Sequence, residues 1–472
     1  MLAFVVGLCS HADAQLRSGR VQRHLRPSAA ESTGSAPDRE PEIALASHSV
    51  PSDKYSILED DSLHSQVAPA SYLGSGDCGC STSGMACDSL GCDACCGMSE
   101  IAPTCMTACP PGCGPLMALW YRLSVRAETP LYWRARQLRQ QLVTSSAVGT
   151  PQQDVGVLDL NSTNVLLGDS RLNEDLQVGV RLSLSTWLGG GEQLGLMFRY
   201  WNAGEQNDTF AFNSNQFPNL ARPIFDTTNA NAFQDTAQLI GFQSDINTAP
   251  TLTGNISVDT QSSVDGLEVT LKRLLYKDRF TRIDWLYGYQ HVSIDEGLQI
   301  SSFSDDASGV TIAVSDRFNT RNDFNGVSYG ITSTRTFARW KMETLIRLGA
   351  GNLRRRVNIS GNTTITSGGL TNPTSQGLLA RDTNSHPFED DTFIVLPEVG
   401  INFGYCLRRG MDFTVGYNYM HIPKVAQASQ QINDDLAVNL SDPLTGPSNP
   451  SFQFDERTYW LHSLGLGLQW RY

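Results

Sequence analysis

The residues with the most evident chemical potential are nine cysteines gathered in one short stretch of the chain. The spacings Cys92-x-x-Cys95 and Cys105-x-x-x-Cys109 would suit metal ligands, but no histidine lies nearby. Such density is typical of an oxidising compartment, so we expect disulfides, with cross-linking thiols or a metal cluster as alternatives. Because nine is odd, one thiol is left for Cys406 or for a disulfide-linked partner in the cell envelope. The nine are Cys78, Cys80, Cys87, Cys92, Cys95, Cys96, Cys105, Cys109 and Cys113.

A second candidate is an acidic run that follows a histidine. His386 precedes Glu389, Asp390 and Asp391, and His421 lies in another alternating segment. A histidine among carboxylates could activate a water for hydrolysis. Acidic runs are common in solvated loops, and no Ser-x-x-Lys or Gly-x-Ser-x-Gly element accompanies this one. We therefore expect no enzyme, no catalytic residue, no metal and no cofactor.

A third group consists of charges that recur at alternate positions of apolar segments. Alternate residues of a strand face opposite sides, so one face of these segments is charged and the other is aliphatic or aromatic. An unpaired charge that faces lipid at the bilayer midplane costs about 2 to 4 kcal/mol. We therefore expect these charges to face the lumen of a membrane barrel. They are Arg122, Arg126, Glu128, Glu268, Lys272, Arg282, Asp284, Lys341, Glu343, Arg347 and Glu398.

The alternation is clearest at the C-terminus, where Tyr472, Trp470, Leu468 and Leu466 share one face. A strand that ends in an aromatic residue resembles the closing strand of bacterial outer-membrane barrels. The barrel assembly machinery recognises this terminal aromatic residue. We expect this segment to close a barrel in the cell outer membrane, with the barrel assembly machinery and outer-membrane lipid as partners.

Ten alternating segments are found after residue 116, and their connections are long and short in turn. The long ones run over residues 133–171, 201–258, 295–321, 353–392 and 422–456. Short periplasmic turns, long outer loops and an even strand number are typical of outer-membrane barrels. The sequence thus predicts an all-β fold: a single antiparallel transmembrane β-barrel of about ten strands. If 356–366 adds to the wall, the barrel would have twelve strands or more.

Composition excludes other classes. The charged fraction is 18%, and no run approaches the ~18 consecutive apolar residues of a membrane helix. A net charge of -13 argues against a nucleic-acid partner. We divide the chain into an expected signal peptide (1–14), ending in an Ala-x-Ala site, a disordered linker (15–77), a Cys/Gly-rich segment (78–115) and the barrel (116–472).

From about residue 118 to 472 the chain resembles the putative beta-barrel porin family of planctomycetes, the seventh of the families so described. The resemblance rests on the segments YRLSVRAETPLYW (121–133), VGVRLSLSTWL (178–188), WKMETLIRLGAGN (340–352) and the segment 396–422, together with the aromatic terminus. It implies a barrel fold and an outer-membrane location, and it brings no catalytic or ligand residues with it.

The expected function is a porin-like channel for small solutes. Eight strands leave an interior that side chains fill, and open aqueous channels need about sixteen, so in ten strands we expect the lumen charges to pair as a plug. A selectivity lining is the alternative. Two other interpretations are a structural or adhesive surface protein that acts through its outer loops and, more remotely, a surface hydrolase like the omptin proteases. The sequence does not indicate an oligomeric state.

Overall fold

The computed structural model describes residues 122–134, 137–138, 140–168, 171–172, 176–188, 191–228, 234–437 and 448–471. The expected signal peptide, linker and Cys/Gly-rich segment, and also Tyr472, lie outside these residues. The described residues form strands and two short 3-10 turns, η3 (Gln152–Asp154) and η4 (Ala428–Gln431), and they contain no α-helix. The fold is all-β, as the sequence predicts.

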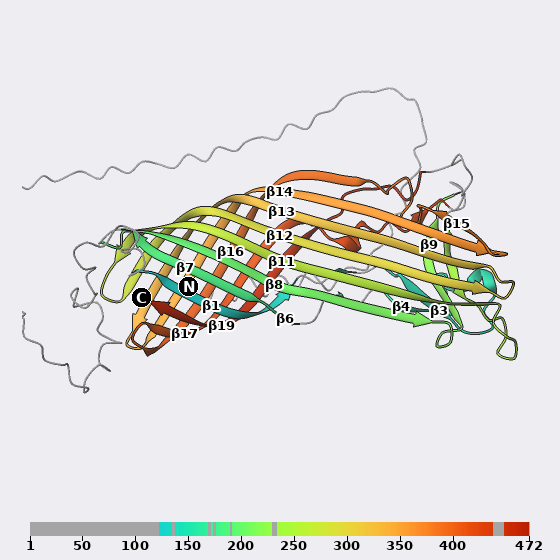
Figure 1. Cartoon of the computed structure of the whole chain (residues 1–472), viewed down its shortest axis with the longest axis horizontal. Coiled ribbons are helices and arrows are strands. Elements are labelled where there is room, and N and C mark those ends of the chain that lie inside the picture. Colours follow the sequence, from blue (N-terminus) through green and yellow to red (C-terminus); the bar gives the residue numbers. More distant parts are fainter. Residues whose placement is uncertain are drawn as a thin grey trace, which may run out of the picture. The chain divides into compact units, whose positions relative to one another are not determined.

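Ten antiparallel strands close into a ring (Figure 1). Each strand pairs with its neighbours, and the last strand pairs with the first from Ser124↔Arg471 to Arg134↔Leu461. The strands are β1 (Ser124–Arg134), β7 (Val180–Leu188), β8 (Leu194–Asn213), β11 (Leu252–Lys277), β12 (Thr281–Asp306), β13 (Thr311–Phe337), β14 (Trp340–Ser367), β16 (Pro387–Arg408), β17 (Met411–Ala426) and β19 (Glu456–Arg471). The prediction of ten strands is confirmed.

Short strands extend the sheet without joining the ring. β6 (Gln177–Val178) pairs with β1, and β15 (Leu370–Thr374) pairs with the end of β14. The alternative with twelve wall strands is wrong, because residues 356–366 continue β14 rather than form another strand. A further pair joins β2 (Gln137–Leu138) to β5 (Arg171–Leu172).

Four strands are far longer than a membrane requires. β11, β12, β13 and β14 have 26, 26, 27 and 28 residues, whereas about 9 to 11 residues cross a bilayer. The expected outer connection 295–321 is therefore mostly wall: β12 and β13 are a continuous hairpin that turns between Asp306 and Thr311. The barrel extends well beyond the membrane on its outer side.

The two zones of the wall have opposite polarity. In the membrane zone of β12, Trp285 and Tyr287 face outward and are about half exposed, while Asp284 faces inward and is buried. In the outer zone of the same strand, the inward positions are the buried Leu298 and Ile300. Lipid covers the outer face of the first zone and water covers that of the second, so the buried face changes from polar to apolar along one strand.

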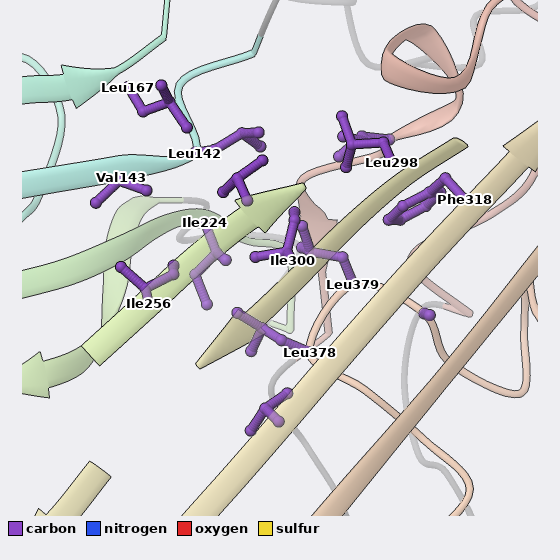
Figure 2. Packing of buried hydrophobic residues seen from close by; sticks show 14 of the residues in the cluster. Leu142, Val143, Leu167, Ile224, Ile256, Leu298, Ile300, Phe318, Leu378 and Leu379 are labelled. Atoms are coloured by element: carbon purple, nitrogen blue, oxygen red, sulfur yellow. The ribbon is translucent and has the colours of Figure 1, made fainter. Parts of the chain in front are cut away.

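A small inner sheet, which we name the cap, fills the outer zone. It consists of β3 (Val143–Ser146), β4 (Thr163–Leu167), β9 (Asn219–Asp226), β10 (Gln234–Gly241) and β18 (Asp435–Leu436). Cap residues such as Leu142, Val143 and Ile224 pack against the inward-facing Ile256 and Ile300 of the wall (Figure 2). Parts of the long outer connections therefore fold into the barrel mouth and form its hydrophobic core.

Candidate functional site

The membrane zone of the lumen is crossed by a cluster of four buried charges, which we name the lumen cluster. It consists of Arg199 (β8), Glu268 (β11), Arg347 (β14) and Glu398 (β16). The Arg199 guanidinium lies 2.6 Å from Glu268 and 2.8 Å from Glu398, and Nη2 of Arg347 lies 2.8 Å from Glu398. Arg347 also pairs with Glu268. Each cation thus bridges the two anions, and the four side chains join strands on different sides of the ring.

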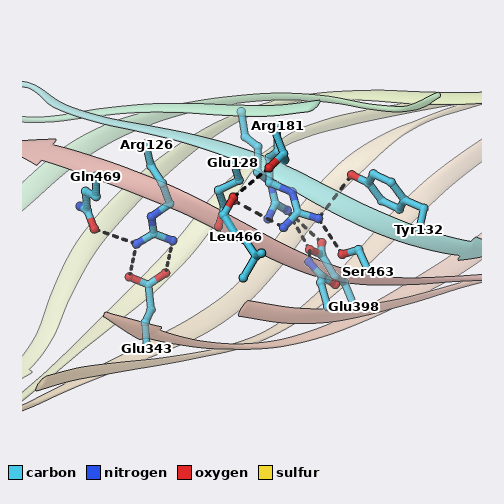
Figure 3. Close-up of polar contacts among 12 residues, drawn as sticks. Arg126, Glu128, Tyr132, Arg181, Glu343, Glu398, Ser463, Leu466 and Gln469 are labelled. Carbon is cyan, nitrogen blue, oxygen red and sulfur yellow. Dashed lines mark hydrogen bonds and ion pairs between the residues drawn. The ribbon is translucent and has the colours of Figure 1, made fainter. Parts of the chain in front are cut away.

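Hydrogen bonds from neighbouring strands extend this cluster. Asn418 Nδ2 of β17 donates to Glu398 Oε1 over 2.6 Å. Beside it, Arg181 of β7 lies 3.6 Å from Glu128 of β1 and donates to Ser463 of β19 over 2.9 Å (Figure 3). These side chains come from strands at or near the closing seam, so the charged layer includes residues from eight of the ten ring strands.

A second charged layer lies nearer the periplasmic turns. Arg126 of β1 reaches across to Glu343 of β14, with both guanidinium nitrogens 3.3 Å from the carboxylate, and also donates to Gln469 (Figure 3). Arg282 pairs with Asp284 over 2.8 Å. Unlike charges therefore neutralise one another through much of the lumen.

The remaining predicted lumen residues take less central positions. Lys272 places its ammonium 5.2 Å from the ring centre of Trp187, which faces inward from β7. The Arg282 guanidinium covers the same ring at 3.9 Å. Lys341 is on the inward face of β14, two positions from Glu343, and Arg122 lies two residues before the start of β1. In the barrel-closing strand, Trp470, Leu468 and Leu466 share the outward face.

Two central residues were missed by the list of expected lumen charges. Arg181 and Arg199 both occupy the polar phase of their strands, VRLSLSTWL and LGLMFRY, and this phase was the available signal. Tyr132, whose hydroxyl lies 3.5 Å from Arg181, was also missed. Period-2 alternation places a side chain on a face, but it does not show which strands lie opposite each other across a lumen.

An apolar layer lies on the outer side of the lumen cluster. Tyr132 and Trp201 stack there at 6.1 Å, and Phe324 and Leu396 are buried in the same group. A Cβ atom on Gly266 would lie 2.4 Å from the Trp201 ring, so only glycine leaves room for this indole. Between the charged and apolar layers remains a cavity of about 10 Å³, which has room for about one water. The lumen is thus tightly filled at this level.

The cap is fixed to the wall by buried polar contacts. Asp316 of β13 receives 2.9 Å hydrogen bonds from the backbone N–H groups of Leu379 and Ala380 on one oxygen, and on the other it pairs with Arg222 of β9 at 2.6 Å. Arg222 and Asp316 are both buried. Asn322 of β13 also exchanges two hydrogen bonds with the backbone of Ala426, the last residue of β17, from which the next connection begins. Wall strands therefore hold the folded connections through specific polar anchors.

The acidic run near His386 does not form one group. Glu389 and Asp391 face outward, where Glu389 pairs with Arg354 and Arg356 while Asp391 accepts from Asn352; Asp390 is an inward position and pairs with Arg355. His386 packs against Phe388 at 6.3 Å, and His421 lies beside the Tyr419 hydroxyl at 3.5 Å. The hydrogen bond from Arg354 lowers the pKa of Glu389 below its ordinary value.

The predicted cysteine chemistry lies almost wholly outside the described residues. The exception is Cys406 near the end of β16, which is disulfide-bonded. Among the described residues there is no group of three or more His, Cys, Asp or Glu side chains that could hold a metal ion. No helix in the described part of the chain has the length and hydropathy needed to cross a membrane.

A closed ring of ten strands, with an outward apolar band and a charged lumen, defines an outer-membrane β-barrel. The chain matches the family described as putative beta barrel porin-7 over residues 124–472, and it belongs to that family. It is an outer-membrane protein of the porin type. The expected family is confirmed, and the planctomycete origin stays a prediction.

Solved outer-membrane structures resemble this chain at low identity. The outer membrane protease OmpT from Escherichia coli is 8% identical over 74% of this chain and 97% of its own, with a TM-score of 0.33. A major outer membrane protein from Thermus thermophilus is 9% identical over 73% of this chain and 99% of its own, with a TM-score of 0.18. The outer membrane channel DcaP of Acinetobacter baumannii is 8% identical over 74% of this chain and 98% of its own, with a TM-score of 0.15. No protein of curated function matches the chain.

Proposed function

We propose that this barrel is a channel for small solutes that is closed at rest by its lumen cluster. The observation that carries the proposal is the bridging of Glu268 and Glu398 by Arg199 and Arg347, from four different wall strands. In a ring of ten strands such a cluster obstructs the route through the membrane zone. The channel in this state passes little or no solute.

The lumen is obstructed by charged rather than apolar side chains, and this supports a channel that can open rather than a permanently filled barrel. Two buried charges lose hydration energy that their mutual attraction does not reliably offset, so an apolar filling would serve stability at least as well. Arginine and glutamate side chains differ from such a filling in one respect: they are well hydrated once water enters. A charged lumen can therefore become a water-filled route when its pairs separate.

The adhesive interpretation depends on outer connections that project from the barrel. Several described parts of these connections pack inward instead, with Leu220, Leu379 and Ile432 in the hydrophobic cluster of the outer zone, while β15 and residues 244–251 are exposed. The carboxylates near His386 have arginine or amide partners, which gives no support to a hydrolase. We therefore propose that the protein is not an enzyme. Lipid, the assembly machinery and a disulfide-linked envelope partner remain the predicted partners.

Single-channel recording in planar bilayers tests the proposal. The wild type is expected to show small or no steady conductance, and Arg347→Ala is expected to give larger openings because it leaves Glu268 and Glu398 with one cation. Arg354→Ala is the matched control, since Arg354 belongs to the same strand but faces outward. A stable wild-type conductance on the scale of general porins would contradict closure by the cluster. Equal effects of the two variants would contradict its assignment as the gate.

A further inference from the structure

A polar groove of about 640 Å³ lies on the outer wall, away from the lumen. It crosses five neighbouring strands, β11, β12, β13, β14 and β16, which lie side by side (Figure 1). The register places Ser263, Asp295, Arg321, Arg356 and Glu389 in one cross-strand row through its floor. The next row, which lies farther from the membrane, contains Gln261, Gly297, Asn319, Asn358 and Pro387. The groove is therefore lined by charges on one side and by amides on the other.

The charges of the groove already neutralise each other. Arg321 lies 3.7 Å from Asp295 and 3.0 Å from Asp323, and Arg356 lies 3.5 Å from Asp323 and 3.1 Å from Glu389. With two arginines against three carboxylates, the floor has no excess positive charge for a phosphate. Planar side chains held in this way still present both donors and acceptors at fixed positions, which is the pattern that sugar hydroxyls require.

Two amides of the second row leave hydrogen-bonding capacity unused, while Gln261 donates to Glu205 of β8 over 2.8 Å. The side chains of Asn319 and Asn358 make no hydrogen bond to another residue that the structure describes. Between them and Gln261 lies Gly297, where an added Cβ would meet only Asn319 Oδ1 at 3.2 Å and Gln261 Cβ at 3.9 Å. Pro387 at the end of the row offers an apolar surface for the C–H face of a sugar ring. This row has room for a ligand and groups that would bind it.

The height of the groove identifies the source of such a ligand. On β12 the outward aromatic band ends with Tyr289 and His291, and Asp295 follows four residues later. Four residues correspond to about 13 Å along a strand and to about 10 Å in height at a tilt of about 40°. The headgroup region adds only about 5 to 8 Å beyond the hydrocarbon core. The groove thus faces the layer just above the headgroups, where the sugars of glycolipids lie.

We propose that this groove binds the sugar chain of an outer-leaflet glycolipid. The Asn319 and Asn358 amides bind sugar hydroxyls, and the paired Arg321 and Arg356 fix the orientation of the ring. Binding at this site fastens the protein to the lipid around it and is independent of the state of the lumen. It therefore holds whether or not the barrel conducts.

Calorimetric titration of the full-length barrel in detergent tests this site with three probes: lipopolysaccharide with a complete core, its lipid A, and the released core oligosaccharide. We expect the complete lipopolysaccharide to bind at least tenfold more tightly than lipid A and more tightly than the free core. The double variant N319A/N358A is expected to bind at least about fivefold more weakly, since each of the two lost hydrogen bonds typically contributes about 0.5 to 1.5 kcal/mol. Gly297→Trp, which fills the groove, should abolish binding.

The control is Asn207→Ala, because Asn207 pairs with Gln261 in the same row but lies on β8, beyond the groove. Heat-shifted gel mobility shows whether each variant is folded. Lipid A that binds as tightly as the complete lipopolysaccharide would overturn sugar recognition. Equal affinity for the free core would overturn the lipid-borne source. Unchanged affinity in folded Gly297→Trp would overturn the site itself.

Discussion

At the residue scale, Asp316 shows how a buried charge fixes the cap. Its carboxylate pairs with Arg222 and accepts hydrogen bonds from two backbone N–H groups, in surroundings that exclude water. A buried ion pair contributes little net stability when it is intact, but removal of one partner costs about 3 to 5 kcal/mol because the other charge is left uncompensated. The contact therefore matters more for the position of the cap than for the total stability of the barrel.

A double-mutant cycle on this pair tests the argument. Arg222→Met and Asp316→Leu are each expected to lower the unfolding free energy by about 3 to 5 kcal/mol, and the double variant to recover much of that loss. Denaturant unfolding in lipid vesicles measures all four proteins. Additive losses in the double variant would show that the two side chains do not act as a pair.

The sequence predicted the face on which each lumen charge lies, but not its partner across the lumen. Alternation assigned Arg126, Glu268 and Arg347 to the polar face, and the structure shows each of them in a lumen ion pair. It could not show that Arg199 bridges β11 and β16, because partners across a ring depend on its closure and stagger. Face is a local property of a strand, whereas pairing across the lumen is a property of the whole ring.

At the element scale, the outer zone explains why the strand ends were misjudged. The segment 295–321 is rich in Ser and Asp, which suggested a solvated loop. Asp295, Gln299 and Ser301 face outward from the wall, while Leu298, Ile300 and Phe318 face the cap. In the membrane zone the apolar residues of a strand face outward, whereas in the outer zone they face inward. A pattern that expects apolar residues on the outward face therefore does not recognise the part of the strand beyond the membrane. The cap could not be predicted, since its short strands carry no long alternation.

Removal of the cap hairpin tests the role of this element. Replacement of residues 219–241, which contain β9 and β10, with a short Gly-Ser linker uncovers apolar wall residues such as Ile256 and Val258. We expect increased binding of a hydrophobic dye, since contiguous exposed apolar surface attracts such ligands. Conductance should stay low because the lumen cluster is intact. A large steady conductance in this variant would show that the cap, rather than the cluster, closes the barrel.

Protonation provides a second test, on the outer face of β14 and β16. The hydrogen bond from Arg354 lowers the folded-state pKa of Glu389, with Arg356 adding to the effect. A lowered carboxyl pKa means that the stabilising contribution is complete above the unfolded-state pKa and is lost as the pH falls through the folded-state value. Carbon NMR of labelled glutamate should therefore show Glu389 titrating below an ordinary glutamate, and Arg354→Ala should raise its midpoint. A midpoint unaffected by that change would contradict the assigned cause.

At the scale of the whole molecule, closure of the ring depends on one seam. β19 pairs with β1 through eleven residue pairs, from Ser124↔Arg471 to Arg134↔Leu461, and with β17 on its other side. The seam joins the two ends of the barrel in the sequence, so it can form only when the last strand is in place. The charged layer depends on it as well, because Arg181 donates to Ser463 of the closing strand.

The terminal aromatic residues should therefore decide whether the barrel assembles. Changing Trp470 and Tyr472 to Ser removes the terminal signal and part of the lipid-facing girdle together, and we expect loss of the heat-shifted folded band from outer-membrane fractions. The control is the double change of Trp340 and Tyr405 to Ser, since these rings contact each other at 4.9 Å on β14 and β16, near the same periplasmic end. It removes two girdle rings and leaves the terminus intact. If assembly fails only in the terminal variant, the closing strand is read as a signal; if both variants fail alike, the girdle alone accounts for the loss.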